Sequence, residues 1–192
     1  MKKNMICISG NIAVGKTEVA KIISEELNYK LYRASDYFRE LSRQMNMDLV
    51  TFNEYVENNP DIDKSIENNT KQVVEKENNI VIDARLGFLL SGTKAFRVYM
   101  VASKDVAASR LFEAAKTRGK EEKYKDVESV LEAIDIRENS EHERYLKLYG
   151  VDVHDESNYD YVIDTTTLNS KQVAEKIINA YNVWNKVDFS EG

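Results

Sequence analysis

Short runs of apolar residues alternate along the chain with longer stretches in which apolar residues recur every three or four positions. The short runs predict five strands, at residues 5–9, 30–33, 79–83, 96–101 and 159–164. Three of these runs are almost continuously apolar, which is typical of strands that are covered by helices on both faces. The pattern therefore predicts a buried sheet.

The longer stretches have the 3.6-residue spacing of amphipathic helices. They predict helices over residues 17–27, from Ser103 onward, over 127–149 and over 170–184. Residues 35–77 are helical in pattern throughout, and we expect two or three helices that break near Pro60. Alternating strands and helices predict parallel strands joined by right-handed crossovers. We therefore expect a three-layer α/β fold, with a mainly parallel five-stranded sheet and helices on both faces.

The composition is that of an ordinary globular protein. The 192 residues are 42% hydrophobic and 31% charged, which suffices for one domain, residues 1–192, without disulfides. One cysteine and two histidines exclude a disulfide framework and a Cys/His zinc site. A net charge of −6 argues against a nucleic acid polymer or an anionic membrane as partner. The first apolar run is too short for a signal peptide or a spanning helix, so we expect a cytoplasmic protein.

One motif follows the first predicted strand directly. Residues 10–17, GNIAVGKT, match G-x-x-x-x-G-K-[ST]. The two glycines let the loop wrap so that backbone N–H groups point at a phosphate, and the N-terminus of the next helix adds partial positive charge. Lys16 would reach the β- and γ-phosphates, and the Thr17 hydroxyl would bind Mg²⁺. The expected nucleotide-binding residues are Gly10, Asn11, Ile12, Ala13, Val14, Gly15, Lys16 and Thr17.

The surroundings of this motif favour an ATP and Mg²⁺ site over a chance glycine-rich turn. The motif lies between a strand and an amphipathic helix, as the mechanism requires, and the chain has only seven glycines. The N-K-x-D match at residues 185–188, NKVD, follows the last predicted helix and does not stand directly after a strand, where a translation-type GTPase would need it. A short chain with this loop and a helical segment after the second strand fits the small-molecule kinases.

Four later segments resemble those of one kinase family. Residues 35–40, SDYFRE, resemble its S-G-x-x-[YF]-R entry to the nucleoside monophosphate site, and residues 83–85, DAR, resemble its D-G-R loop. Residues 137–145, RENSEHERY, resemble its R-[ED]-x-x-[DE]-x-x-R-Y helix, and residues 164–168, DTTTL, resemble its D-[ST]-[ST]-x-L turn. Over most of its length, and in this order of segments, the chain resembles the cytidylate kinases of the short, archaeal type.

The resemblance implies a P-loop kinase fold with a helical acceptor-binding insertion at residues 35–77 and a lid at residues 116–126. The residues that it implies for acceptor binding are Asp36, Arg39, Asp83, Arg85, Arg137 and Glu141. The side chains that it implies for catalysis are Lys16, Arg85, Arg110, Arg118, Arg137 and Arg144. Asp83 would share the Mg²⁺ with Thr17, and the alternative is that it caps the end of its strand.

Arginine suits these roles because phosphoryl transfer between two polyanions needs positioned positive charge, and a guanidinium can bind phosphate with two parallel hydrogen bonds. Arg137, Glu141 and Arg144 have the spacing of one helix face. The alternative for that face is a solvated row of ion pairs. For Asp36, the alternative is that it caps the following helix.

The leading hypothesis is ATP-dependent phosphoryl transfer to CMP or dCMP, giving CDP or dCDP. One alternative is another small-molecule P-loop kinase, with a nucleoside or a coenzyme precursor as acceptor. A second is a nucleotide-binding switch with little transfer activity, because Ala84 replaces the glycine of D-G-R and Ala107 replaces a common arginine. We expect small nucleotides as partners and a monomer or weak homo-oligomer. Cys7 is expected to be a buried thiol, and His142 and His154 to be surface residues without a role.

Overall fold

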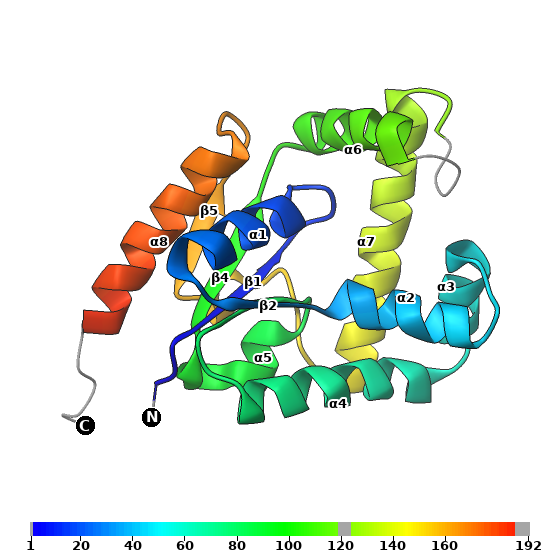
Figure 1. The fold of residues 1–192 in the computed structure, drawn as a ribbon. Coiled ribbons are helices and arrows are strands. Elements are labelled where there is room, and N and C mark those ends of the chain that lie inside the picture. Colours follow the sequence, from blue (N-terminus) through cyan, green and yellow to red (C-terminus); the bar gives the residue numbers. More distant parts are fainter. Residues whose placement is uncertain (1, 119–123, 187–192) are drawn as a thin grey trace.

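The computed structural model describes residues 2–118 and 124–186 of the 192-residue chain. The described residues form one sheet in the order β2-β3-β1-β4-β5, in which all neighbouring strands are parallel (Figure 1). The strands are β1 (Met5–Gly10), β2 (Lys30–Arg33), β3 (Ile80–Asp83), β4 (Phe96–Val101) and β5 (Tyr161–Asp164). The five strands and the parallel sheet that the apolar runs predict are thereby confirmed.

Two strands begin later than the pattern predicts. Asn79 has a φ of 53°, a left-handed conformation outside the strand region, so β3 begins at Ile80. Tyr159 follows the 3-10 turn Glu156–Asn158, so β5 begins at Tyr161. Tyr159 is nevertheless buried. An apolar run in the sequence indicates which residues are buried, not which have strand backbone conformation. The run can therefore extend beyond the strand, as it does at Tyr159.

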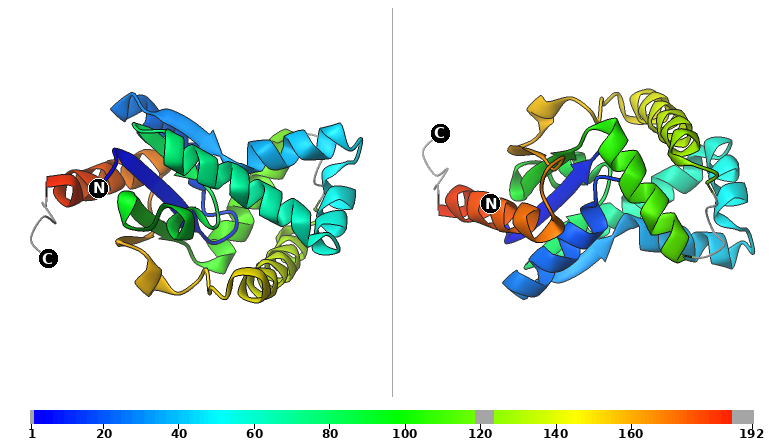
Figure 2. Two further views of the ribbon diagram at one scale, coloured as in Figure 1. Left: turned by 90° about the horizontal axis from the view of Figure 1, so that it is seen from below. Right: turned by 90° about the horizontal axis from the view of Figure 1, so that it is seen from above.

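Eight α-helices accompany the sheet. They are α1 (Lys16–Leu27), α2 (Ala34–Gln44), α3 (Leu49–Glu57), α4 (Pro60–Lys76), α5 (Gly87–Ser91), α6 (Lys104–Arg118), α7 (Val127–Tyr149) and α8 (Ser170–Lys186), counted over the described residues. On one face α1 and α8 pack through Ile23 and Ile177 against β1 and β4, while Val74 of α4 packs on the other face (Figures 1 and 2). This is the three-layer arrangement that the sequence predicts.

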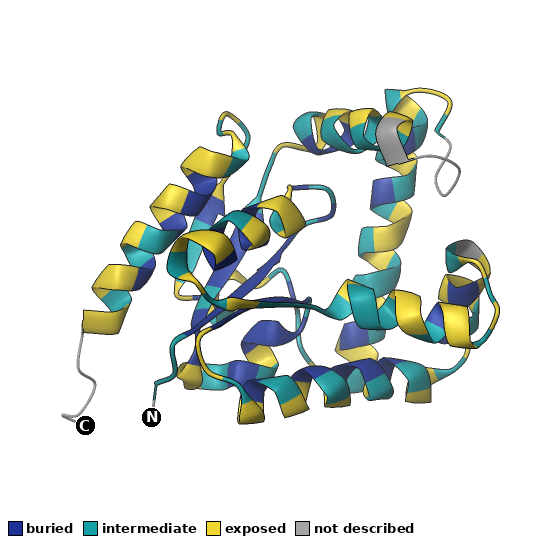
Figure 3. Ribbon diagram, viewed as in Figure 1, coloured by how far each residue is buried: buried dark blue, intermediate teal, exposed yellow. Residues whose placement is uncertain are grey.

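The stretch at residues 35–77 forms three helices, as its pattern allows. The first break follows α2, where Asn46 has a φ of 53°, and the second precedes Pro60. Pro60 is the first residue of α4, where a missing N–H costs nothing. Only Ser42 of α2 is buried, and Figure 3 shows α2 mostly in the colours of exposed and intermediate residues. The helix α2 is therefore an extension beside the main core, whereas α4 contributes Val74 to the core.

The long helix α7 has a capped start and a glycine at its end. Asp126 caps the start of α7 and accepts a hydrogen bond from the Ser129 N–H, and Gly150, with a φ of 66°, ends the helix. In Figures 1 and 2, α2, α3 and α7 lie on the side of the sheet away from both termini. The carboxyl ends of β1 and β3 open toward this side, which is where open parallel sheets bind ligands. None of the helices in residues 2–118 and 124–186 is long and apolar enough to cross a membrane.

Candidate active site

The phosphate loop begins in very close contact with the neighbouring strand. Gly10 has a φ of 145°, and a Cβ placed on it would lie 2.2 Å from the Met100 carbonyl oxygen of β4. Gly15 has a φ of 90° and Ala13 a φ of 61°. The two glycines of the motif are therefore required by geometry, one by a close approach and both by a left-handed backbone.

Lys16 lies under the loop and contacts the main chain of its first turn. Its Nζ donates to the Gly10 carbonyl at 2.9 Å and also to the Asn11 carbonyl. Burial, and then the nearby Arg85 guanidinium, lower the pKa of Lys16 to about 7. A bound polyphosphate would favour the charged ammonium again, because it places negative charge beside a desolvated amine.

Thr17 and Asp83 are brought together by the pairing of β1 with β3, in which Ile8 lies opposite Asp83. The Thr17 hydroxyl donates to Asp83 Oδ2 at 2.9 Å. A hydroxyl and a carboxylate are hard oxygen ligands of the kind that Mg²⁺ prefers, and Mg²⁺ usually takes few protein ligands beside phosphate and water. The pair therefore fits this ion. No group of three His, Cys, Asp or Glu side chains suited to a metal occurs in the described segments.

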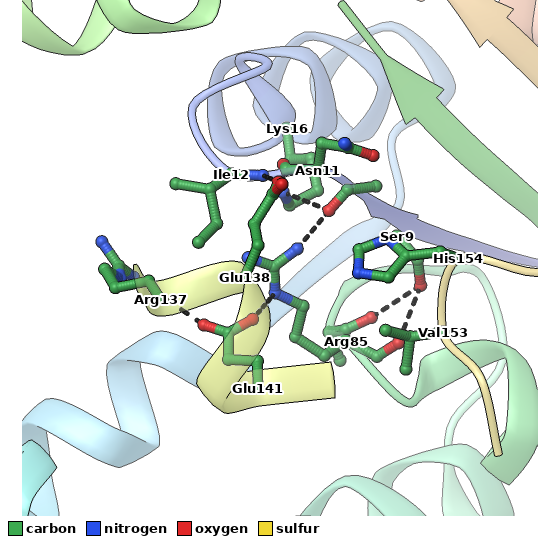
Figure 4. Close-up of polar contacts among 12 residues, drawn as sticks. Ser9, Asn11, Ile12, Lys16, Arg85, Arg137, Glu138, Glu141, Val153 and His154 are labelled. Carbon is green, nitrogen blue, oxygen red and sulfur yellow. Dashed lines mark hydrogen bonds and ion pairs between the residues drawn. The ribbon is translucent and has the colours of Figure 1, made fainter. Parts of the chain in front are cut away.

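Arg85 connects the loop to the long helix α7. One of its terminal nitrogens donates to the Gly10 carbonyl, and its Nε lies 2.8 Å from Glu141 Oε2 (Figure 4). Arg137, one helical turn earlier on α7, lies 4.0 Å from the other oxygen of Glu141. Burial opposes ionisation of Glu141, but Arg85 and Arg137 hold its pKa below the ordinary value. Two guanidinium groups thus converge beside the phosphate loop around one carboxylate.

Glu138 makes a contact that the sequence patterns do not reveal. Its Oε1 accepts a hydrogen bond of 3.0 Å from the backbone N–H of Ile12, in the phosphate loop (Figure 4). A carboxylate that accepts a hydrogen bond from a backbone N–H of such a loop makes the same kind of charge-assisted hydrogen bond that a phosphate would make there. The loop is therefore in direct contact with α7 as well as with β4.

A profile of the cytidylate kinase-like family matches residues 5–167 of this sequence. The chain belongs to this family. It is 35% identical to the cytidylate kinase of Archaeoglobus fulgidus over 178 residues, which cover 93% of this chain and 94% of that one. It is also 35% identical to the cytidylate kinase of Thermoplasma acidophilum over 186 residues, with 95% of each chain covered. The resemblance of the sequence to short, archaeal cytidylate kinases is thereby confirmed.

The fold of this cytidylate kinase-like chain is shared with other small kinases. A shikimate kinase from Bacteroides thetaiotaomicron has a similar structure, with a TM-score of 0.61 at 16% sequence identity, covering 95% of this chain and 98% of that one. At such low identity the likeness concerns the fold alone. The P-loop kinase fold that the motif and the element order predict is confirmed.

In the first turn of α2, Asp36 pairs with two arginines. Arg33 Nε donates to Asp36 Oδ2 at 2.7 Å, and Arg39 lies 3.6 Å from the other oxygen. The N-cap of α2 is Arg33, so Asp36 lies in the first turn and is not the cap that the alternative supposed. Arg39 and Asp36 thus stand together at the start of the insertion, and their role in acceptor binding stays a prediction.

Arg110 lies apart from the arginines beside the loop. It donates to the Thr165 carbonyl at 2.6 Å, to the Thr165 hydroxyl at 3.0 Å and to the Leu168 carbonyl at 3.1 Å. These contacts hold Arg110 against the turn after β5, the segment that resembles D-[ST]-[ST]-x-L, and its role in catalysis stays a prediction.

The side chain of Arg118 and residues 119–123 of the expected lid lie outside the described part of the chain. The catalytic role of Arg118 and the lid therefore also stay predictions.

Arg144 reaches the insertion from α7. Its Nε lies 2.8 Å from Asp63 Oδ2 on α4, and Asp63 is buried. Glu67, one turn further along α4, is also buried, and its Oε2 has no hydrogen-bond partner among the described residues. The face with Arg137, Glu141 and Arg144 therefore contacts two other parts of the fold and is not a solvated row of ion pairs.

Glu67 makes the stability of this α4–α7 contact depend on pH. Burial, and then the nearby Asp63 carboxylate, raise the pKa of Glu67 from 4.5 to about 8. Between these values the folded protein keeps a proton that the unfolded chain loses, so the free energy of unfolding falls as the pH rises toward 8.

The prediction is tested with E67Q. Urea denaturation at several pH values in this range should show that the free energy of unfolding falls less steeply with pH in E67Q than in the parent. The matched control is E75Q, at an exposed position of α4, which should keep the parental slope. An unchanged slope in E67Q would contradict the assignment.

Both histidines differ from their prediction as surface residues. His142 and His154 are half-buried, with ring centroids 5.6 Å apart, and they line a cavity of about 450 Å³. The other lining residues are Asn11, Tyr99, Val101, Glu138, Asn139 and Glu156. Cys7 is buried as predicted. The sequence carried no signal for Tyr99, because it falls inside an apolar run, and none for the histidines, because neither belongs to a motif.

Proposed function

We propose that the protein transfers the terminal phosphoryl group of ATP to CMP or dCMP, giving CDP or dCDP. The observation that carries the proposal is the position of Arg85, between the Gly10 carbonyl of the phosphate loop and Glu141 on α7. A cation at that point can contact the donor phosphates and an acceptor phosphate at once. The relatives in Archaeoglobus fulgidus and Thermoplasma acidophilum that bear the name cytidylate kinase support the acceptor.

The donor side of the reaction uses the loop and Lys16. Backbone amides of the loop and the N-terminus of α1 would bind the phosphates, with Lys16 turning from the Gly10 carbonyl to phosphate oxygen. Thr17 and Asp83 would hold Mg²⁺, which when bound supplies positive charge to the phosphates. These residues orient the donor and neutralise it, and they form no covalent bond with it.

The acceptor side uses the insertion and α7. Arg85 and Arg137 would bind the phosphate of the acceptor, and Glu141 would hold both guanidinium groups in place. Arg39 and Asp36 would contact the acceptor from α2, and Arg118 would close over the reacting groups. Arg110 and Arg144 would have to leave Thr165 and Asp63 to join it. Positioning and charge neutralisation suffice for phosphoryl transfer, in which an oxygen of the acceptor phosphate attacks the γ-phosphorus and ADP leaves, so no protein side chain needs to act as the nucleophile. The proposal includes a cytoplasmic monomer or weak homo-oligomer that acts on small nucleotides.

A panel of acceptors tests this function. ADP release from MgATP is measured with CMP, dCMP, UMP, AMP, a nucleoside, a non-nucleotide alcohol and no acceptor. The expected result is release stimulated most strongly by CMP or dCMP. Strong stimulation by a nucleoside or by the alcohol alone would favour another small-molecule kinase. ATP binding without stimulation by any acceptor would favour a nucleotide-binding switch, and either result would overturn the proposal.

A further inference from the structure

The first turn of the phosphate loop is held against β4 by backbone and by side chain. The Asn11 N–H donates to the Met100 carbonyl at 3.0 Å, next to the close approach of Gly10. The side chain of Asn11 adds a second contact, because its Oδ1 accepts a hydrogen bond of 2.7 Å from the Tyr99 hydroxyl. Asn11 is thus the residue through which β4 contacts the loop with a side chain.

His154 contacts the same hydroxyl from the other side. Its Nδ1 lies 2.8 Å from the Tyr99 oxygen. A phenol has one proton, and Tyr99 gives it to Asn11, so the ring of His154 must be the donor of the second hydrogen bond. This requirement fixes a proton on Nδ1 of His154. The two contacts form a directed chain, in which His154 donates to Tyr99 and Tyr99 donates to Asn11.

The surroundings of Tyr99 leave its hydroxyl little freedom. The side chain is 3% exposed, and its ring packs on the ring of Tyr159 with centroids 4.6 Å apart. Burial raises the pKa of Tyr99 well above its ordinary value, so the phenol keeps its proton at neutral pH. The hydroxyl therefore has a fixed position and a fixed direction.

The loop needs such support because parts of its backbone are strained. Ala13 has a left-handed conformation at φ 61°, which a residue with a side chain adopts only at a cost in free energy. Strained backbone persists where surrounding contacts over-determine it. Lys16, which also contacts the Asn11 carbonyl, cannot serve this purpose once it contacts phosphate. The Tyr99 contact does not involve the phosphate-binding groups and can persist during the reaction.

We propose that Tyr99 and His154 are positioning residues, which act through Asn11 to hold the phosphate loop in the shape that receives the donor phosphates. The inference rests on the proposed function only for the identity of the donor. Neither residue touches the reacting atoms in this proposal. The effect of removing them is therefore expected in donor affinity rather than in the transfer step.

Tyr99→Phe tests the proposal, because it removes the hydroxyl and keeps the ring. The dissociation constant of MgATP, measured by calorimetry without acceptor, should rise about fivefold, the size expected for one lost hydrogen bond. The turnover number at saturating ATP and the KM of the acceptor should stay close to parental values. Since binding is measured without acceptor, a failure of the proposed acceptor would leave this result interpretable.

Tyr159→Phe is the matched control. The Tyr159 hydroxyl donates to the Val153 carbonyl at 2.8 Å, and the residue is 8% exposed, so the variant loses a comparable buried hydrogen bond. The Tyr159 hydroxyl is also close to the Ser9 side chain of β1, but among the described residues it makes no hydrogen bond to loop residues 10–17. Both variants should lose similar thermal stability, but only Y99F should bind ATP more weakly. Equal ATP affinity in the two variants would overturn the proposal.

Two further variants test the chain of hydrogen bonds. H154A should weaken ATP binding in the same direction as Y99F, and H154N should restore it, because the asparagine amide can donate from nearly the position of Nδ1. In a double-mutant cycle, Y99F combined with N11A should weaken ATP binding no further than N11A alone. Additive effects of Y99F and N11A on ATP affinity, or equal effects of H154A and H154N on ATP affinity, would overturn the proposed positioning role.

Discussion

Replacing Arg85 with Ala is expected to lower the turnover number with CMP by about 10²–10³-fold, the loss typical of one preorganised donor at a developing charge. Arg85 contacts the Gly10 carbonyl of the loop and lies 2.8 Å from Glu141. It is thus a cationic side chain that connects the donor loop to α7, beside the direct contact of Glu138 with the Ile12 amide. Removing it takes a cation from between two polyanions and leaves Glu141 with the more distant Arg137.

The Arg85 experiment needs a variant that folds. An unpaired buried carboxylate can cost about 3–5 kcal/mol, so R85A must be accompanied by R85K, which keeps a charge near Glu141 but loses the planar guanidinium. We expect a smaller but clear loss of turnover in R85K, with thermal stability near that of the parent. R43A is the control, since the Arg43 side chain is 72% exposed and pairs with Glu40. Near-parental turnover in both Arg85 variants would show that the acceptor site lies elsewhere.

Asp83→Asn is expected to give the second large loss, about 10²-fold at low Mg²⁺ concentration. Asp83 Oδ2 accepts the hydrogen bond of the Thr17 hydroxyl at 2.9 Å, and an asparagine oxygen can still accept it. The variant therefore keeps the shape of the pair and removes its negative charge, which is what binds a divalent cation. Raising the Mg²⁺ concentration should recover part of the lost activity.

The measurement for Asp83 is the Mg²⁺ concentration that gives half-maximal ADP release at fixed ATP. D83N should shift this concentration upward, whereas D61N should not, because the Asp61 side chain is 95% exposed on α4. A D83N protein with parental Mg²⁺ dependence would contradict the metal assignment and favour the alternative in which Asp83 caps its strand.

Most of the fold could be predicted because it follows from local patterns. Buried parallel strands are almost continuously apolar, so β1 and β4 are evident from the sequence as short apolar runs, each with one polar side chain, Ser9 and Arg97. The five-residue helix α5 is too short to display a 3.6-residue period, and it was not predicted. The start of β5 was misplaced because Tyr159 is buried outside a strand.

The candidate site, like the fold, could be predicted from the sequence only where its residues are close together in the chain. The loop from Gly10 to Thr17 could be predicted because all residues of the phosphate-binding motif lie in eight consecutive positions. The contact of Ile12 with Glu138 joins residues 126 positions apart, and that of Asn11 with Tyr99 joins residues 88 apart. Such contacts depend on how β4 and α7 pack against the loop. No periodicity or motif within one segment contains that information.

Carboxylates already lie at the anion-binding groups of this site, since Glu138 is on the Ile12 amide and Glu141 on Arg85. A phosphate that enters must therefore displace a carboxylate from these groups, and the displaced carboxylate stays on the protein close to the phosphate. The complex then carries the negative charge of the nucleotide in addition to the net charge of −6 of the chain. Added salt screens the repulsion between the bound phosphate and the displaced carboxylates, so it should weaken nucleotide binding less than the attraction to Lys16 and the arginines alone would require.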